Sequence, residues 1–140
     1  MEPRIQYALT ADGASVAFWS LGSGPAVIQM PTMPFTHIQM EWEDADFNAW
    51  YTGLLQHFRL TRYDTRGCGL SSAVGQTYTL DSMVEDLRAV ADRAGVTRFG
   101  LIAPVQAGPA AIAFAARYPE RVSRLVLWAA IGHARDIRTR

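Results

Sequence analysis

Hydrophobic and polar positions follow two different periods along this chain, and the switches between them mark the expected elements. Two short runs with strand character flank the Asp12-Gly13 pair, which is a turn sequence typical of β-hairpins. The apolar run at residues 26–30 is short and continuous, as in a strand that is buried on both faces. The beginning of the chain therefore predicts a hairpin over residues 4–21, followed by an interior strand.

Helical spacing follows in three segments. Apolar residues three and four positions apart predict a helix at about residues 44–57, and they are Phe47, Trp50, Tyr51, Leu54, Leu55 and Phe58. A second helix begins after Thr79, whose hydroxyl suits an N-cap, and ends before Gly95. The apolar face of this second helix consists of Leu80, Met83, Leu87, Val90 and Ala94. The third helix occupies residues 107–117 and is terminated by Pro119.

Apolar strands at residues 58–64, 98–103 and 122–130 separate these helices. From residue 25 onward, the order of elements is therefore β-α-β-α-β-α-β. Helical crossovers between apolar strands predict an α/β fold with a mostly parallel, doubly wound sheet and helices on both faces. The length of 140 residues and the 49% hydrophobic content fit a single domain with a buried core.

Charge and cysteine content narrow the range of partners and compartments. Thirteen basic residues balance thirteen acidic ones, so we expect neither nucleic acid nor a membrane surface as a partner. The single cysteine, Cys68, excludes an internal disulfide and is compatible with a reducing cytoplasm. The N-terminus has no long apolar run, so we expect no signal peptide and a cytoplasmic location. We also expect no cofactor and no metal site.

Three loops, at residues 31–37, 64–72 and 103–109, follow the carboxyl ends of predicted parallel strands, where ligands bind in doubly wound sheets. The third loop reads Ala103-Pro104-Val105-Gln106-Ala107-Gly108, with small residues on both sides of its apex. A sharp strand-to-helix turn needs such residues, because the backbone packs closely there. This loop resembles the G-x-S-x-G nucleophile elbow of the α/β-hydrolases.

Three further segments carry the same resemblance, in the same order along the chain. Asp64-Thr65-Arg66-Gly67-Cys68-Gly69-Leu70-Ser71 is similar to the D-x-R-G-x-G-x-S turn of that superfamily, and the helix and strand AAIAFAARYPERVSRLVL are similar too. The loop that begins Met30-Pro31-Thr32-Met33-Pro34 occupies the place of the H-G-x-P oxyanion loop. More finely, the chain resembles hydrolase-like domains found beside bacterial nucleotide cyclase or transcription-regulator modules.

The resemblance implies a partial α/β-hydrolase-like domain over residues 1–140, with its elbow at residues 103–108. We expect the sheet to be truncated after its sixth strand, with no lid and no C-terminal strands. The family acid and histidine normally follow later strands, and His133 and Asp136 come too soon to match them. At the apex, where the family has its nucleophile, stands Val105, which has neither a lone pair nor an acidic proton.

The resemblance also suggests candidate site residues. The backbone N–H groups of Met33 and Gln106 occupy the positions of oxyanion donors. Phe35, His37, Met40 and Trp42 form an aromatic-rich run, which either packs beneath a lid or lines a ligand pocket. Our candidates for the pocket are Met33, Phe35, His37, Val105 and Gln106.

The turn formed by Asp64, Arg66, Gly67, Gly69 and Ser71 is expected to be structural. In this interpretation, Asp64 and Arg66 satisfy loop backbone groups and one another. Cys68 and Ser71 lie in this loop rather than at the elbow, and nothing in the sequence suggests that either replaces the nucleophile.

Three functional hypotheses follow. The first is a non-catalytic hydrolase-like protein that binds a small apolar or ester-like ligand or a protein. The second is the N-terminal fragment of a longer hydrolase-like protein or regulator. The third is a hydrolase or lyase with an unidentified nucleophile. Because the strand at residues 122–128 would be the last of the sheet and is strongly apolar, we also expect self-association or a sheet-completing partner at its edge.

Overall fold

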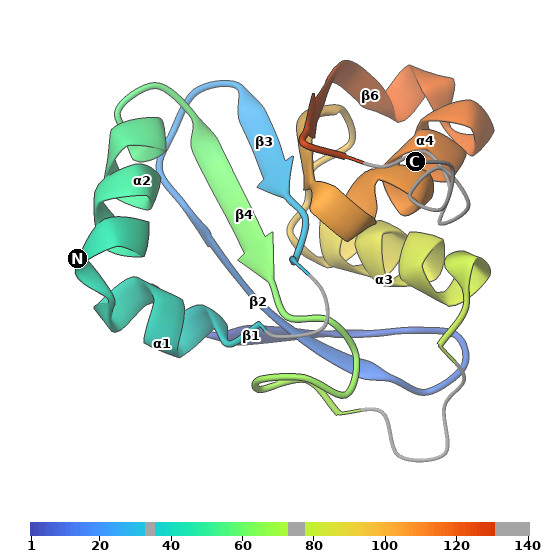
Figure 1. The fold of residues 1–140 in the computed structure, drawn as a ribbon, viewed down its shortest axis with the longest axis horizontal. Helices are drawn as coiled ribbons and strands as arrows, with labels where there is room; N and C mark the ends of the chain where they lie inside the picture. Colours follow the sequence, from blue (N-terminus) through green and yellow to red (C-terminus); the bar gives the residue numbers. More distant parts are fainter. Residues whose placement is uncertain (33–35, 73–77, 131–140) are drawn as a thin grey trace, which may run out of the picture.

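The computed structural model describes residues 1–32, 36–72 and 78–130, and it contains one six-stranded mixed sheet between two layers of helices (Figure 1). The order of the strands across the sheet is β1-β2-β4-β3-β5-β6. Their bounds are β1 Gln6–Leu9, β2 Ser15–Leu21, β3 Ala26–Gln29, β4 Arg59–Tyr63, β5 Phe99–Pro104 and β6 Val122–Trp128. The predicted α/β architecture, with a hairpin at the start of the chain, is confirmed.

Strand direction divides the sheet into two parts. The hairpin strand β1 pairs with β2, and β2 pairs with β4, both in antiparallel fashion. Strands β4, β3, β5 and β6 are parallel neighbours. The loops that follow β3, β4 and β5 therefore leave the sheet at the same end, as the sequence predicts for a doubly wound fold.

Helices cover both faces of this sheet (Figure 1). Helices α1 (Ile38–Glu43) and α2 (Ala45–Leu55) pack on one face, over a small core that contains Trp19, Tyr51 and Leu60. Helices α3 (Leu80–Arg93) and α4 (Gly108–Arg117) pack on the other face, over the larger core that includes Phe18, Ile28, Leu87, Leu101 and Phe114.

Helix α2 confirms the helix predicted at about residues 44–57, whereas the short helix α1 before it was not predicted. The ring nitrogen Nδ1 of His37 accepts a hydrogen bond from the Met40 N–H at 3.3 Å and so caps α1. Asp44 is extended, with ψ of 133°, and ends α1. The Asp44 carboxylate then accepts hydrogen bonds from the N–H groups of Asp46 and Phe47, which starts α2. One residue thus separates two helices.

Helix α3 begins where the sequence predicts. Thr79 and Ser82 form a reciprocal capping box, in which each side chain accepts a hydrogen bond from the backbone of the other. Leu87 and Val90 are fully buried, as expected for the apolar face. The assignment of Leu80 to that face is wrong: Leu80 is the first residue of the helix and is 44% exposed.

A buried polar network fixes the α1–α2 layer to the sheet. Arg62 of β4 donates to Glu41 at 2.8 Å and to the Tyr51 hydroxyl at 3.0 Å. The Tyr51 hydroxyl donates to the other Glu41 oxygen at 2.6 Å. Because all three side chains are buried and bonded to one another, the charge of Arg62 is compensated within the core.

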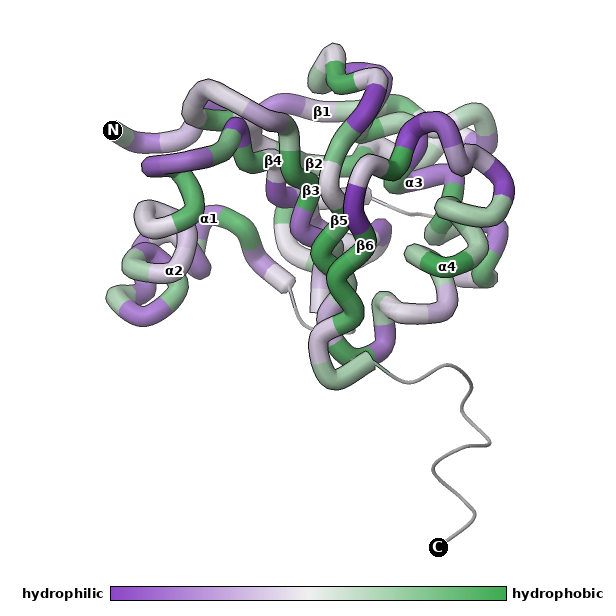
Figure 2. The backbone as a smooth tube through the Cα atoms, turned by 90° about the horizontal axis from the view of Figure 1, so that it is seen from above, coloured by the Kyte–Doolittle hydropathy of each residue, from purple (hydrophilic) through white to green (hydrophobic). Residues whose placement is uncertain are grey.

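Strand β6 forms one edge of the described sheet, and its side chains remain exposed toward its end: Leu125, Val126, Leu127 and Trp128. Figure 2 shows β6 as a hydrophobic segment along this edge. Within the described ranges, no helix has the length and apolar character needed to cross a bilayer.

Candidate functional site

The elbow lies between β5 and α4. Strand β5 ends at Pro104, a short 3-10 turn spans Val105–Ala107, and α4 starts at Gly108 with Pro109 in its first turn. Ala103 and Ala107 are almost completely buried, which explains the need for small residues on both sides of the apex. The sequence prediction of a tight strand-to-helix turn at residues 103–108 matches this geometry.

Val105 at the apex has a left-handed backbone, with φ of 47°. A β-branched side chain rarely adopts this conformation, because its Cβ approaches the backbone carbonyl, at a cost of about 1–2 kcal/mol. Strained residues of this kind cluster at functional sites in proteins. The backbone of an elbow is therefore present, and its apex carries an aliphatic side chain.

A cavity of about 490 Å³ opens beside Val105. Its walls come from the ends of three strands, the beginning of α2 and the elbow itself. The lining residues are Gln29, Thr32, Asp46, Phe47, Trp50, Pro104, Val105, Trp128 and Ala129. We call this space the elbow cavity. It lies at the end of the sheet where doubly wound folds bind their ligands.

Two tryptophans from distant parts of the sequence meet in the wall of the elbow cavity. The ring centroids of Trp50 and Trp128 are 5.6 Å apart, with an angle of 36° between the ring planes. The indole N–H of Trp50 donates to the side-chain oxygen of Gln29 at 2.8 Å, and Gln29 itself is only 5% exposed. This hydrogen bond fixes the Trp50 ring, so that wall of the cavity is preorganised.

The turn after β4 is held together by buried hydrogen bonds. The Asp64 carboxylate accepts from the N–H of Ile38 at 3.0 Å and from the N–H of Leu70 at 2.9 Å. Burial raises the pKa of Asp64, and these N–H groups partly offset that effect. The Ser71 hydroxyl donates to the Asp64 carbonyl and accepts from the Ala17 N–H. The turn thus joins β2, β4 and α1.

Gly69 is required in this turn for two reasons. Its φ is +53°, and a Cβ at this position would lie 2.2 Å from a carboxylate oxygen of Asp64. The glycine therefore lets Asp64 approach the backbone closely.

Arg66 points to other partners than the sequence predicts. Its guanidinium donates to both carboxylate oxygens of Asp86 on α3, at 2.6 to 3.0 Å, and to Asp12 in the hairpin turn at 2.6 Å. The expected mutual pairing of Asp64 and Arg66 is wrong, because backbone N–H groups occupy the Asp64 carboxylate and two other carboxylates surround Arg66. The hydrogen bond from Arg66 lowers the pKa of Asp12 to about 2.

The remaining predicted residues fall in different places. Met33 and Phe35 lie outside the described residues, as do His133 and Asp136. Gln106 is exposed on the first turn after the apex and does not line the elbow cavity. Of the five pocket candidates, Val105 is the one that the structure places in the wall of this cavity.

His37 lines a separate cavity of about 730 Å³, together with Cys68 and Phe47. His37 is engaged as the cap of α1. Burial, followed by the nearby Asp64 carboxylate, raises the pKa of the Cys68 thiol. The raised pKa favours the thiol of Cys68 over the thiolate, which is the nucleophilic form.

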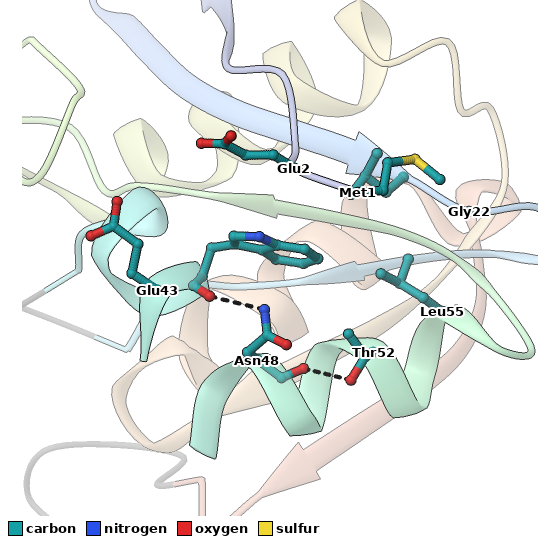
Figure 3. Close-up of a pocket in the computed structure, with 9 residues that line it drawn as sticks. Met1, Glu2, Gly22, Glu43, Asn48, Thr52 and Leu55 are labelled. Carbon is teal, nitrogen blue, oxygen red and sulfur yellow. Dashed lines mark hydrogen bonds between the residues drawn. The ribbon is translucent and has the colours of Figure 1, made fainter. Parts of the chain in front are cut away.

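A further cavity, of about 530 Å³, lies between the beginning of the chain and α2 (Figure 3). Two of its polar side chains are bonded within the protein: Asn48 donates to the Trp42 carbonyl at 2.9 Å, and Thr52 donates to the Asn48 carbonyl at 2.7 Å. Its lining residues do not include the elbow. Within the described part of the chain, no group of three or more His, Cys, Asp or Glu side chains could hold a metal ion.

Sequence reasoning missed most of the wall of the elbow cavity. Phe47 and Trp50 contribute to the helical spacing that predicts a helix, but this spacing does not show that they are 47% and 42% exposed and line a cavity. Asp46, Gln29 and Trp128 lie near the ends of their elements. For Gln29 and Trp128, the position at the carboxyl end of a strand is the signal that could have identified them, because doubly wound sheets bind ligands at that end.

Comparison with known proteins places this geometry in a family. The model of the family described as alpha/beta hydrolase fold matches residues 43–139. The chain is 29% identical to cis-3-alkyl-4-alkyloxetan-2-one decarboxylase from Shewanella oneidensis, over 89% of this chain and 38% of that protein. This sequence therefore spans well under half of that curated relative.

Solved structures agree. A hydrolase from Pseudomonas aeruginosa superposes with a TM-score of 0.71 at 30% identity, and the match covers 89% of this chain and 45% of that one. A meta-cleavage product hydrolase from Pseudomonas fluorescens, solved as a serine-to-alanine mutant complexed with acetates, gives a TM-score of 0.75 at 25% identity, over 91% of this chain and 45% of that one. The elbow, the turn after β4 and the sheet order, together with these matches, assign the chain to the α/β-hydrolase fold family.

Proposed function

We propose that this chain is a hydrolase-fold unit that binds a small apolar or ester-like molecule in the elbow cavity without using residue 105 as a nucleophile. The observation that carries the proposal is Val105, which occupies the strained apex and faces the cavity. A valine side chain cannot attack a carbonyl, so the first step of acyl transfer by this fold has no nucleophile at this position.

The wall of the elbow cavity suits such a ligand. Phe47, Trp50 and Trp128 offer aromatic surface to apolar groups. The oxygen of the Gln29 amide is bonded to Trp50, so its NH₂ group remains as a donor for a ligand oxygen. A mostly apolar pocket with a few polar groups that fix orientation is typical of small-molecule sites.

The relatives support the same class of ligand. The Shewanella protein is named for an oxetan-2-one, which is a cyclic ester with alkyl substituents. The decarboxylase also keeps a second candidate open, in which this fold carries out lyase chemistry with another side chain. If the chain is part of a longer protein, the proposal concerns this unit of it.

Covalent labelling tests the absence of a serine nucleophile. We expect no stoichiometric labelling by a fluorophosphonate probe and no turnover of a short-chain activated ester. We expect little gain from Val105→Ser, because nucleophile, base and acid act as a unit. Labelling that heat denaturation abolishes, or a large esterase rate in the serine variant, would contradict the proposal.

Tryptophan fluorescence tests binding. Titration with butyl acetate should change the emission of the native chain, because Trp50 and Trp128 line the site. Trp128→Leu should remove most of this response. Trp42→Phe is the matched control, because Trp42 lines the cavity of Figure 3 and not the elbow cavity. An equal loss in both variants would count against the elbow cavity as the site.

A further inference from the structure

The elbow cavity combines three aromatic rings with one carboxylate. Phe47, Trp50 and Trp128 supply the rings, and Asp46 supplies the charge. No arginine, lysine or histidine occurs among its described lining residues. We propose that the elbow cavity selects a small organic cation, an ester or amide that carries a quaternary ammonium group. This inference rests on the proposed function, because it names the ligand class of the same cavity.

The aromatic rings provide the first part of the recognition. The tilted Trp50 and Trp128 rings keep large exposed areas, with 42% and 56% of each residue accessible. A cation above the face of a tryptophan, within about 6 Å of the ring centre, is attracted by the ring quadrupole. The hydrogen bond from the indole N–H of Trp50 to Gln29 holds this ring in the wall of the cavity.

Charge on the adjoining helices provides the second part. From Ile38 to Gln56 the sequence contains four carboxylates and neither arginine nor lysine. Glu41 is neutralised by its buried pair with Arg62. Asp46 lines the cavity from the first turn of α2, whereas the exposed Glu43 and Asp44 lie outside its described lining. The Asp46 carboxylate is therefore the group in this lining that attracts a cation.

The polar lining residue Gln29 indicates a second group that the ligand carries. The NH₂ group of Gln29 is a donor at the end of β3, beside the elbow. A ligand whose ammonium group rests between the rings and Asp46 can place a carbonyl oxygen on this donor. The uncharged analogue would keep the apolar contacts and the carbonyl bond but lose the attraction to the rings and to Asp46.

The test compares acetylcholine with 3,3-dimethylbutyl acetate, in which carbon replaces the ammonium nitrogen. Isothermal titration and tryptophan fluorescence at low salt should give at least about tenfold tighter binding of acetylcholine. Asp46→Asn should reduce this preference to about threefold or less. Added salt should weaken the binding of acetylcholine more than the binding of the neutral ester. Glu43→Gln, which removes a neighbouring carboxylate outside the cavity, is the matched control and should retain the preference.

The outcomes separate this inference from the proposed function. If the neutral ester binds as tightly as acetylcholine, the cation inference is wrong and binding in the elbow cavity stands. If Asp46→Asn and Glu43→Gln lower the preference equally, Asp46 has no specific role and the inference also fails. If neither ester produces heat or a fluorescence change at millimolar concentration, the proposed function itself is contradicted.

Discussion

Two loops at the same end of the sheet are built on different principles. In the turn at residues 64–71, buried polar groups hold one another: Asp64 binds two backbone N–H groups, and Arg66 binds Asp86 and Asp12. In the elbow at residues 103–108, small buried residues bring the backbone into a sharp turn around Val105. The conformation of the first loop depends on the identity of its charged residues. The conformation of the second depends on the small size of the residues on both sides of its apex.

This difference shows how a hydrolase fold can keep its elbow with a valine at the apex. The apex residue Val105 lines the cavity, whereas Ala103 and Ala107 beside it are buried. We therefore expect a change at the apex to alter the cavity more than the fold, whereas a change at Arg66 removes a structural connection. Family membership establishes the fold, and function has to be argued from the site.

The largest expected effect is that of Arg66→Ala. The variant leaves the buried Asp86 without its partner, so we expect a loss of about 3–5 kcal/mol in the free energy of unfolding. Urea denaturation followed by circular dichroism measures this loss. Arg88→Ala is the matched control, because Arg88 forms partly exposed pairs with Glu85 and Asp92 on α3, and its loss should stay within about 1 kcal/mol. Equal losses in both variants would show that the turn does not depend on its charges.

The second prediction concerns the apolar edge at β6, through which we propose self-association or binding of a sheet-completing partner. Light scattering coupled to size exclusion should show association of the chain that increases with concentration. Val126→Lys should weaken it at least about tenfold, because Val126 is 51% exposed on the edge strand. Ile112→Lys, at an exposed apolar residue of α4, is the control. A monomer at all concentrations would exclude self-association through this edge.

A third prediction tests the strain at the apex. Asparagine tolerates the left-handed conformation better than valine, so Val105→Asn should raise the free energy of unfolding by about 1 kcal/mol. Val122→Asn, at a half-buried position with φ of −105°, should lower it by a similar amount. Thermal or urea unfolding distinguishes the two signs. If both variants are destabilised alike, the left-handed apex carries no strain.

The smallest expected effect is a pH dependence at the turn. Arg66 lowers the pKa of Asp12 from 3.8 to about 2, so this pair stabilises the fold above about pH 4 and loses its contribution as the pH falls to about 2. Because Asp12 is half exposed, the effect should be at most about 1 kcal/mol. Unfolding between pH 4 and 2 should be less pH-dependent in Asp12→Asn than in the native chain. A variant at the exposed Asp81, which pairs with Arg117, should retain the native slope.

Local patterns predicted much of the fold. The hairpin turn, the cap at Thr79 and the small residues of the elbow each act within a few neighbouring residues, so the sequence displays them directly. The short helix α1 was missed because it has only six residues, between the two caps His37 and Asp44. Its length is too small for a helical period to stand out.

Long-range pairing could not be predicted in the same way. The partners of Arg66 lie on α3 and in the hairpin turn, and no spacing in the sequence brings Asp86 and Asp12 to one guanidinium. The wall of the elbow cavity could not be predicted for the same reason. Periodicity places Trp50 on a helix and Trp128 on a strand, but it does not show that the two rings are in contact. Tertiary contacts between separate elements decide both cases.

The contact between Trp50 and Trp128 has a consequence for the order of folding. One indole belongs to the helix layer and the other to the last strand, so their approach requires the chain between them to be arranged first. Residues 51–127 separate the two rings, and contacts over such a sequence separation form more slowly than helices and hairpins. We therefore expect the cavity wall to assemble late, after most of the α1–α2 layer is in place. In stopped-flow refolding, the emission of this tryptophan pair should reach its native value in the final kinetic phase.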